Sequence, residues 1–167
     1  MENLIQNEVL SDQGKTLYIW HENKILADIP SWQVYGFCLM PNGLVPLVRD
    51  KGEKRFTLPG GRVDEGEAPQ AALIREFIEE AQFKPEKIKL LGSLEVIEKD
   101  LEGKITGHHQ QVRFICSASE AGEFIPYKDD FEVEERIFVK PEELVNYINW
   151  LKSITGQAQY QSFMKNK

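Results

Sequence analysis

Apolar and polar residues alternate along several short stretches of the chain, a pattern typical of β-strands with one buried face. The same stretches are rich in aromatic and β-branched residues, which favour strands. They predict strands at residues 16–22, 31–40, 44–49, 55–58, 87–99, 108–117 and 132–139. Pro41-Asn42-Gly43 separates the second strand from the third, and because Asn-Gly is a strong signal for a tight turn, we expect a hairpin there.

A longer period marks the helices, and residues 67–81 give the clearest one. Pro69 suits a first helical turn, where a missing N–H costs little. One stripe of apolar residues recurs with helical spacing and is expected to be buried: Ile74, Phe77, Ile78 and Ala81.

Two further helical segments are expected near the C-terminus. The first begins at Pro141 and has an apolar face made of Leu144, Val145, Ile148 and Leu151. The second is a short amphipathic piece with Tyr160, Phe163 and Met164. Strands, a helix, more strands and then helices indicate a mixed α/β or α+β fold rather than regular βαβ alternation.

The length of 167 residues predicts one domain, residues 1–167. A composition that is 41% hydrophobic and 28% charged is that of a soluble globular protein. No run approaches the roughly 18 apolar residues that a membrane span requires, and the N-terminus has no apolar signal core, so we expect neither membrane insertion nor export. Cys38 and Cys116 each lie in an apolar, strand-like run, where a buried free thiol is expected, and this favours the reducing cytoplasm.

The net charge of −7 argues against nucleic acid as the main partner, because proteins that bind phosphate backbones usually carry a basic patch. The basic residues are scattered, apart from one group at Arg49, Lys51, Lys54 and Arg55. An acidic protein that acts on phosphates usually needs a cation between itself and its substrate.

The clearest helix also has an acidic face. Glu76, Glu79 and Glu80 stand at i, i+3 and i+4, so their carboxylates lie on one side. Arg75 can pair with Glu79, but no other basic residue follows at pairing distance before Lys84, past the expected helix end. A solvated acidic face is the ordinary explanation of such a run. The shortage of counter-charges also suits a divalent cation such as Mg²⁺, which prefers oxygen ligands.

The residues before the helix change the balance between these two interpretations. A tight turn at Gly60-Gly61 leads into an acidic loop, and from Gly61 the chain reads five residues, Glu67, seven residues and then Arg75-Glu76-Phe77-Ile78-Glu79-Glu80-Ala81-Gln82-Phe83. This resembles the Nudix box, Gly-x5-Glu-x7-Arg-Glu-U-x-Glu-Glu-x-Gly-U, in which U is a bulky apolar residue. Leu58-Pro59-Gly60-Gly61 resembles the usual entry to that box. All defined positions but one match, and the strand pattern extends the likeness more loosely to about residues 30–140.

The resemblance implies a Nudix-like α/β/α sandwich with a mixed β-sheet, in which the box forms a loop, a helix and a loop at the edge of the sheet. It implies one or more Mg²⁺ or Mn²⁺ ions bound by Glu76, Glu79 and Glu80, with Arg75 orienting a catalytic glutamate. Glu67 would steady the loop or join the outer metal shell. The expected reaction is the attack of water on a phosphorus of a diphosphate. A cation offsets charge on the phosphoryl oxygens, and a glutamate, with Glu76 as the first choice, takes the proton of the water.

Gln82 is the one departure from the family pattern, which has glycine at this position. A glycine would serve there as the left-handed residue just after the helix. A glutamine in that conformation costs about 1–2 kcal/mol, so we expect either that cost or a different helix end. No metal ligand is lost.

Several residues outside the box remain open candidates. Family members often recruit a further acidic residue from a loop, although each carboxylate available here is by itself better explained as a solvated side chain: Glu120, Glu123, Asp129, Asp130 and Glu132. For His108-His109 a surface or turn role is favoured over metal binding. The basic group just before the glycine turn could contact substrate phosphates or form a solvated rim. Aromatic residues of one strand could stack a base, but such residues are usually core or sheet surface: Trp32, Tyr35 and Phe37.

Two functions are compatible with these residues. The leading one is hydrolysis of a phosphoanhydride bond in a nucleoside diphosphate linked to another group, such as a nucleoside triphosphate, a nucleotide sugar, ADP-ribose or a dinucleotide. The alternative is a catalytically silent Nudix domain that binds a nucleotide and regulates another process. No glutamate of the box is replaced, which favours catalysis. The C-terminal helices are expected to pack on their own sheet, and a second subunit of a homodimer is the other surface they could cover.

Overall fold

The computed structural model describes residues 3–167. Its main sheet has the strand order β1-β2-β6-β7-β3-β5. The strands are β1 (Ile5–Ser11), β2 (Gly14–Glu22), β3 (Ser31–Leu39), β5 (Gly60–Arg62), β6 (Glu86–Asp100) and β7 (Ile105–Ser117). β3 and β7 are parallel and the other neighbours are antiparallel, so the sheet is mixed, as predicted. A second sheet pairs β4 (Val45–Asp50) with β8 (Val133–Val139).

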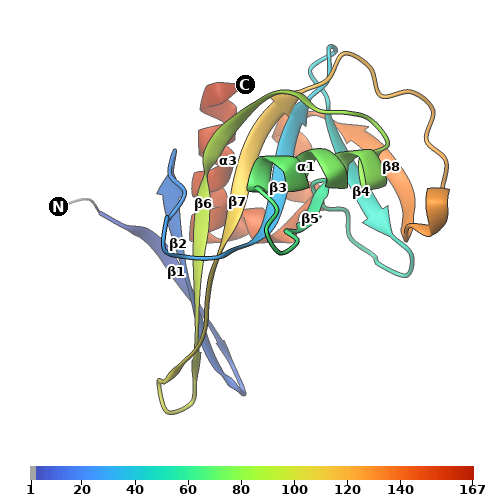
Figure 1. Ribbon diagram of the computed structural model, residues 1–167. Coiled ribbons are helices and arrows are strands. Elements are labelled where there is room, and N and C mark those ends of the chain that lie inside the picture. Colours follow the sequence, from blue (N-terminus) through green and yellow to red (C-terminus); the bar gives the residue numbers. More distant parts are fainter. Residues whose placement is uncertain (1–2) are drawn as a thin grey trace.

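Helices cover both faces of the main sheet (Figure 1). On one face α1 (Pro69–Glu76) packs on β3 and β5 and continues into a π-helical turn, η1 (Phe77–Ala81). On the other face α3 (Ile154–Asn166) packs on β1, β2 and β6. Short helical segments complete the chain: η2 (Lys128–Asp130), η3 (Pro141–Glu143), α2 (Leu144–Tyr147) and η4 (Asn149–Lys152). The α/β/α arrangement confirms the predicted fold class.

Successive residues of β3 serve the two helical layers, because side chains alternate between the faces of a strand. Gly36 faces α1 so closely that an added Cβ would lie 2.7 Å from the ring of Phe77. Phe37 points the opposite way and stacks on Phe163 of α3, with 4.7 Å between the ring centroids. The C-terminal helix therefore packs on its own sheet, as expected.

Among residues 3–167, no helix has the length and apolar character needed to cross a membrane.

The expected hairpin at Pro41-Asn42-Gly43 is wrong, although the chain does turn there. The Gly43 N–H donates to the Met40 carbonyl, which closes the turn. The strands then diverge, since β3 pairs with β7 and β5 whereas β4 pairs with β8. The Asn-Gly signal is local, and the choice of a strand's partner is decided by distant residues.

The predicted apolar stripe of the box helix is also partly wrong. Phe77 and Ala81 are buried, but Ile78 is 51% exposed. The helix is anchored by Leu73 and Phe77, which meet Gly36 of the sheet. A residue directly after Phe77 is rotated by about 100° from that contact, so Ile78 faces solvent.

Three smaller predictions need correction. Residues 55–58 form no strand but a single bridge between Thr57 and Val48. The helix expected to begin at Pro141 is broken at Ile148, which adopts an extended backbone, although Leu144, Ile148 and Leu151 are buried as predicted. Strand β1 was not predicted, because its residues are almost all exposed and carry no alternation.

Gln82 does end the helix in the left-handed conformation, with φ 61° and ψ 36°. Its side chain then forms two hydrogen bonds with the backbone of Ile125. Gln82 Nε2 donates to the Ile125 carbonyl at 2.7 Å, and the Ile125 N–H donates to Gln82 Oε1 at 2.9 Å. These bonds offset the backbone strain that glycine would avoid.

We predict that Gln82→Ala lowers the free energy of unfolding by about 1–2 kcal/mol, because alanine keeps the strained backbone and loses both bonds. Gln82→Gly should be about 1 kcal/mol more stable than the alanine variant, because glycine adopts this conformation without strain. Urea denaturation of the three proteins measures both differences. An alanine variant as stable as the wild type would show that the two bonds contribute nothing.

Candidate functional site

Two glycines bring the edge of the main sheet against the box helix. An added Cβ at Gly61 would lie 2.6 Å from the carboxyl carbon of Glu76, and one at Gly60 would lie 2.1 Å from the Val34 carbonyl oxygen. The Gly60 N–H donates to Glu80 Oε2 at 3.0 Å. The missing side chain of Gly61 therefore makes room for the Glu76 carboxylate, and that of Gly60 for the close approach of β3.

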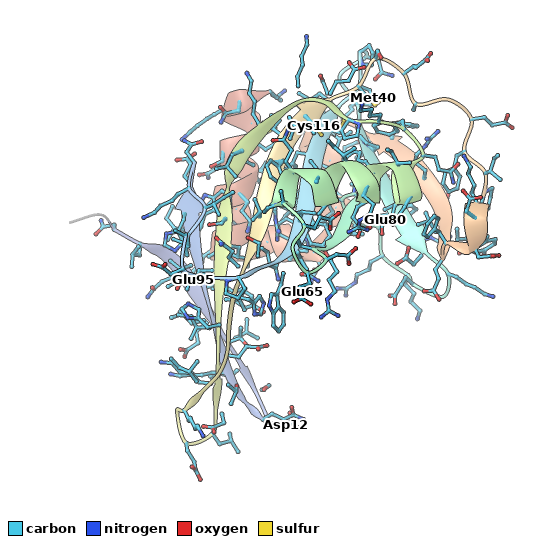
Figure 2. The ribbon with its side chains drawn as sticks, in the orientation of Figure 1. Asp12, Met40, Glu65, Glu80, Glu95 and Cys116 are labelled. Atoms are coloured by element: carbon cyan, nitrogen blue, oxygen red, sulfur yellow. The ribbon has the colours of Figure 1, made fainter. Side chains whose placement is uncertain are left out.

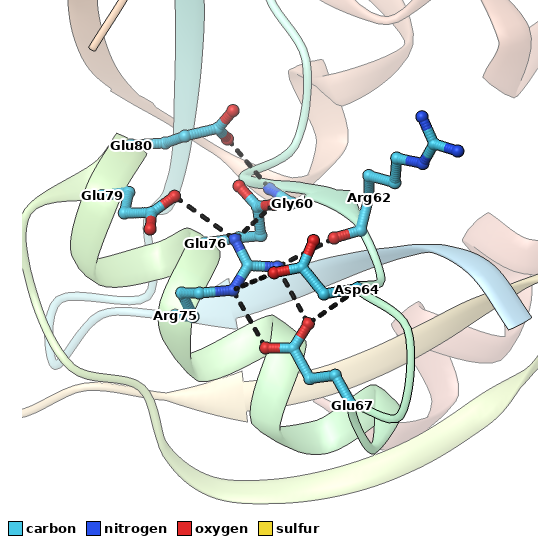
Figure 3. Close-up of polar contacts among 8 residues, drawn as sticks. All are labelled: Gly60, Arg62, Asp64, Glu67, Arg75, Glu76, Glu79 and Glu80. Carbon is cyan, nitrogen blue, oxygen red and sulfur yellow. Dashed lines mark hydrogen bonds and ion pairs between the residues drawn. The ribbon is translucent and has the colours of Figure 1, made fainter. Parts of the chain in front are cut away.

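Arg75 is the centre of a network of ion pairs on the same face (Figure 3). Its Nε and Nη2 donate to the two carboxylate oxygens of Glu67 at 2.9 and 3.0 Å. Its Nη1 donates to Glu76 Oε1 at 3.0 Å and, at a longer 3.4 Å, to Glu79 Oε2. Nη2 also donates to the Arg62 carbonyl at 2.8 Å, so one guanidinium holds the loop and the helix together. The hydrogen bonds from Arg75 lower the pKa of Glu67.

Negative charge accumulates beside this network. The pKa of Glu80 is raised to about 8, first by burial and then by the charges of Glu76, Asp50 and Glu79, while the hydrogen bond from the Gly60 N–H opposes the rise. Burial also raises the pKa of Glu76, although Arg75 opposes this shift. The pKa of Asp50 is raised by burial and then by Glu132 and Glu53. A protein site that stores several buried carboxylates in this way favours a positively charged ligand.

The donor set suits a hard divalent cation, because all its atoms are carboxylate oxygens. Within the described chain, no three His, Cys, Asp or Glu side chains are gathered into a ready-made metal site. Arg75 lies between the carboxylates of Glu67, Glu76 and Glu79. The long contact to Glu79 is the one most easily exchanged for a cation.

Comparison with known proteins identifies this arrangement. A family model described as the NUDIX domain matches residues 17–159. The chain belongs to the Nudix family. The family resemblance inferred from the box is therefore confirmed.

Individual relatives agree with this assignment. The RNA pyrophosphohydrolase of Shewanella sediminis (strain HAW-EB3) is 41% identical over 51 residues, and that match spans 30% of this chain and 30% of the relative. A crystal structure of a Bacillus subtilis pyrophosphohydrolase superimposes with a TM-score of 0.70 at 16% identity, covering 90% of this chain and 92% of that one. The Ap4A hydrolase of C. elegans gives a TM-score of 0.52 at 16% identity, covering 81% and 99% of the two chains. At these identities the solved structures establish the fold.

The Nudix box brings its predicted residues together. Glu67, Glu76 and Glu79 all pair with Arg75, which joins the loop that carries Glu67 to the helix. Glu67 also accepts a hydrogen bond from the Asp64 N–H. Glu80 is held separately by Gly60.

Two residues lie near the box that the sequence did not connect with it. Asp50 ends β4, and its charge acts on Glu80. Tyr35 of β3 pairs in register with Gly60. Burial raises the pKa of Tyr35 most; the charge of Arg113 lowers this pKa, and the charges of Glu80 and Glu76 raise it. The sequence named Tyr35 only as a possible base-stacking residue and did not name Asp50, because both reach the box through the pairing of distant strands.

Five loop carboxylates were weighed as extra ligands, with a solvated side chain as the favoured explanation of each. One of them, Glu132, raises the pKa of Asp50, whose charge in turn raises the pKa of Glu80. The others are exposed on the segment that precedes β8: Glu120, Glu123, Asp129 and Asp130.

The two histidines have different environments. His108 bonds Glu95, which also bonds His21, and Figure 2 shows Glu95 well apart from Glu80. His109 is only 6% exposed, so the surface or turn role expected for it is wrong. It stacks on Trp32, with 4.1 Å between the ring centroids.

The basic group before the glycine turn is mostly engaged elsewhere. Arg49 pairs with Glu134 and Glu135 of β8 and lies over the ring of Phe56. Lys54 and Arg55 line a small cavity beside α2, and Lys51 lies near the ring of Tyr127.

We predict that the metal-free protein loses thermal stability as the pH rises. Glu80 has a pKa of about 8 in the folded chain, against an ordinary value of 4.5. Between these two values the folded chain binds more protons than the unfolded chain, so stabilisation is complete below the lower value and is lost as the pH passes the upper one.

Melting temperatures measured in a chelator across this range test the prediction. Glu80→Gln should flatten the curve and melt above the wild type at pH 8, whereas Glu65→Gln, on the exposed loop, should follow the wild type. Parallel curves for wild type and Glu80→Gln would contradict the assignment.

Proposed function

We propose that this chain is a metal-dependent Nudix pyrophosphohydrolase. It would cleave a phosphoanhydride bond in a nucleoside diphosphate linked to another group. The observation that carries this proposal is the set of crowded box carboxylates: Glu76 lies against Gly61, Glu80 accepts a hydrogen bond from the Gly60 N–H, and Glu79 contacts Arg75. The activity in the names of the Shewanella and Bacillus relatives, pyrophosphohydrolase, agrees with it.

The three glutamates would hold the cation, which we propose to be Mg²⁺ or Mn²⁺. When bound, the cation offsets charge on the phosphoryl oxygens and orients the leaving group. Its positive charge would also favour the ionised form of Glu80, whose pKa is raised mainly by burial and further by the neighbouring carboxylates. The family resemblance implies a divalent ion, and an oxygen-only ligand set suits both Mg²⁺ and Mn²⁺.

The chain's own residues would position the reaction. Glu76 is our choice for the base that accepts a proton from the attacking water. Arg75 orients it through the 3.0 Å hydrogen bond to Oε1, and burial gives it a raised pKa. Glu67 fixes the other side of Arg75. The Gly60 N–H holds Glu80 in place through its hydrogen bond to Oε2.

We further propose that residues 1–167 act as one domain, that the substrate is a small nucleotide, and that the reaction takes place in the cytoplasm. The two buried free thiols, Cys38 and Cys116, are consistent with a reducing compartment. Size-exclusion chromatography would show whether the chain forms a homodimer. One of the C-terminal helices that could form the interface, α3, is packed on the main sheet.

We predict that Glu79→Gln lowers the hydrolysis rate by two orders of magnitude or more, because changes to the partners of metal ligands already cost about 10–100-fold. The measurement is release of phosphate or nucleoside monophosphate from a panel of nucleotides in Mg²⁺ and in Mn²⁺. Glu65→Gln, a change of the same kind on the exposed box loop, is the matched control and should keep the wild-type rate.

The same panel separates the two functions. An unchanged rate in Glu79→Gln would refute the site assignment. Nucleotide binding without any product in either metal would refute catalysis and support the regulatory Nudix domain.

A further inference from the structure

A cavity of about 660 Å³ lies on the opposite face of the main sheet from the box helix. Its walls come from β1, β2, β3, β6 and β7 of the sheet and from η4 and α3. The size is within the range of small-molecule pockets. The residues that matter for its chemistry are Tyr35, Gln111, Arg113, Trp150, Lys152 and Gln159.

Arg113 is the unusual member of this cavity wall. It is 2% exposed. Its Nε donates to Gln159 Oε1 at 2.8 Å and its Nη2 to Gln111 Oε1 at 2.9 Å, while Nη1 has no hydrogen-bond partner. The rings of Tyr35 and Trp150 lie 4.9 and 5.1 Å from the guanidinium carbon.

The charge of Arg113 has no carboxylate to balance it. None of the ion pairs among residues 3–167 includes it, and its two polar partners are neutral amides. Burial lowers its pKa to about 10, which still leaves it protonated at neutral pH. A buried charge without a counter-charge is strongly unfavourable. The bonds to Gln111 and Gln159 explain how Arg113 is held, but not why a cation stands there.

The rest of the cavity wall agrees with an anionic occupant. Lys152 adds a second positive charge, and no Asp or Glu lines the cavity. In a chain with a net charge of −7, a cavity with two cations and no acidic residue stands apart from the general surface.

Tyr35 connects this cavity to the carboxylates of the box. It pairs in register with Gly60 on one side and with Arg113 on the other. After burial, the charges of Glu80 and Glu76 contribute to the raised pKa of Tyr35. Gly60 is the residue whose N–H holds Glu80. One strand position therefore separates the acidic site from the basic cavity.

We propose that the cavity binds a phosphate group of the substrate that lies away from the bond being cleaved, with Arg113 as the specificity-determining residue. Nε and Nη2 donate to Gln159 and Gln111, so Nη1 is the nitrogen left to donate to a phosphate oxygen, in a charge-assisted hydrogen bond. The assignment of this phosphate to a substrate rests on the proposed function, whereas anion binding by the cavity does not.

The test is calorimetric titration of the full chain in a chelator with AMP and with adenosine, which differ by one phosphate. Without a divalent ion the acidic site repels phosphate, so the cavity is the site that is probed. We expect AMP to bind at least about tenfold more tightly than adenosine, as a charge-assisted hydrogen bond would provide. Arg113→Gln should remove this preference, and Lys152→Gln should reduce it by a smaller factor.

Two control variants make the result specific. Arg55→Gln removes an exposed arginine from a different cavity and should leave the AMP preference unchanged. Glu79→Gln should also keep it, so a failure of the hydrolase proposal is distinguishable from a failure of this one. If Arg113→Gln does not fold, the Lys152 variant and the wild-type comparison still decide the matter.

Equal binding of AMP and adenosine would overturn the proposal and show that the cavity recognises the nucleoside. Absence of binding by both at millimolar concentration would also overturn it and leave Arg113 with a structural role alone.

Discussion

Arg75 carries the positive charge on which the arrangement of the box depends. Three carboxylates, those of Glu67, Glu76 and Glu79, converge on its guanidinium, and the loop carbonyl of Arg62 completes its partners. Without that charge the carboxylates would repel one another at short range in a poorly solvated place. Its hydrogen bonds join the loop to the helix, so a single side chain sets both the shape of the site and its charge balance.

Positive charge is distributed unevenly between the two faces of the sheet. On the helix-α1 side, one arginine is outnumbered by carboxylates, so the local excess is negative. On the α3 side, Arg113 and Lys152 line a cavity that contains no acidic residue. Tyr35 lies between the two, in register with Gly60 and with Arg113. A substrate with a diphosphate at one end and a further anionic group at the other would match this separation of charge.

The parts of the site that the sequence predicted are those that lie on one local unit. Arg75, Glu76, Glu79 and Glu80 lie on one helical segment, so helical spacing brings their side chains together, and Glu67 reaches Arg75 from the loop just before it. The mixed sandwich followed from the order of strands and helices and from the box.

What could not be predicted depends on contacts between distant residues. Asp50 and Tyr35 reach the glutamates only because β4 and β3 find partners far away in sequence. The sequence did not single out Arg113, which is buried only because α3 covers that face of the sheet and Gln159 accepts a hydrogen bond from it. The hairpin prediction was wrong for the same reason, because a local turn signal does not determine which sheet the next strand joins.

Gln82 has a side chain that connects the end of the box helix to a distant segment, which a glycine could not do. Its side chain grips the backbone of Ile125, a residue 43 positions further along the chain. Arg136 of β8 fastens the same junction, since it donates both to the carbonyl of Ala81 and to that of Gly122. These hydrogen bonds tie the end of the helix to the segment that leads to β8. At the chain's one departure from its family pattern, the residue that ends the helix also joins it to a second loop by hydrogen bonds.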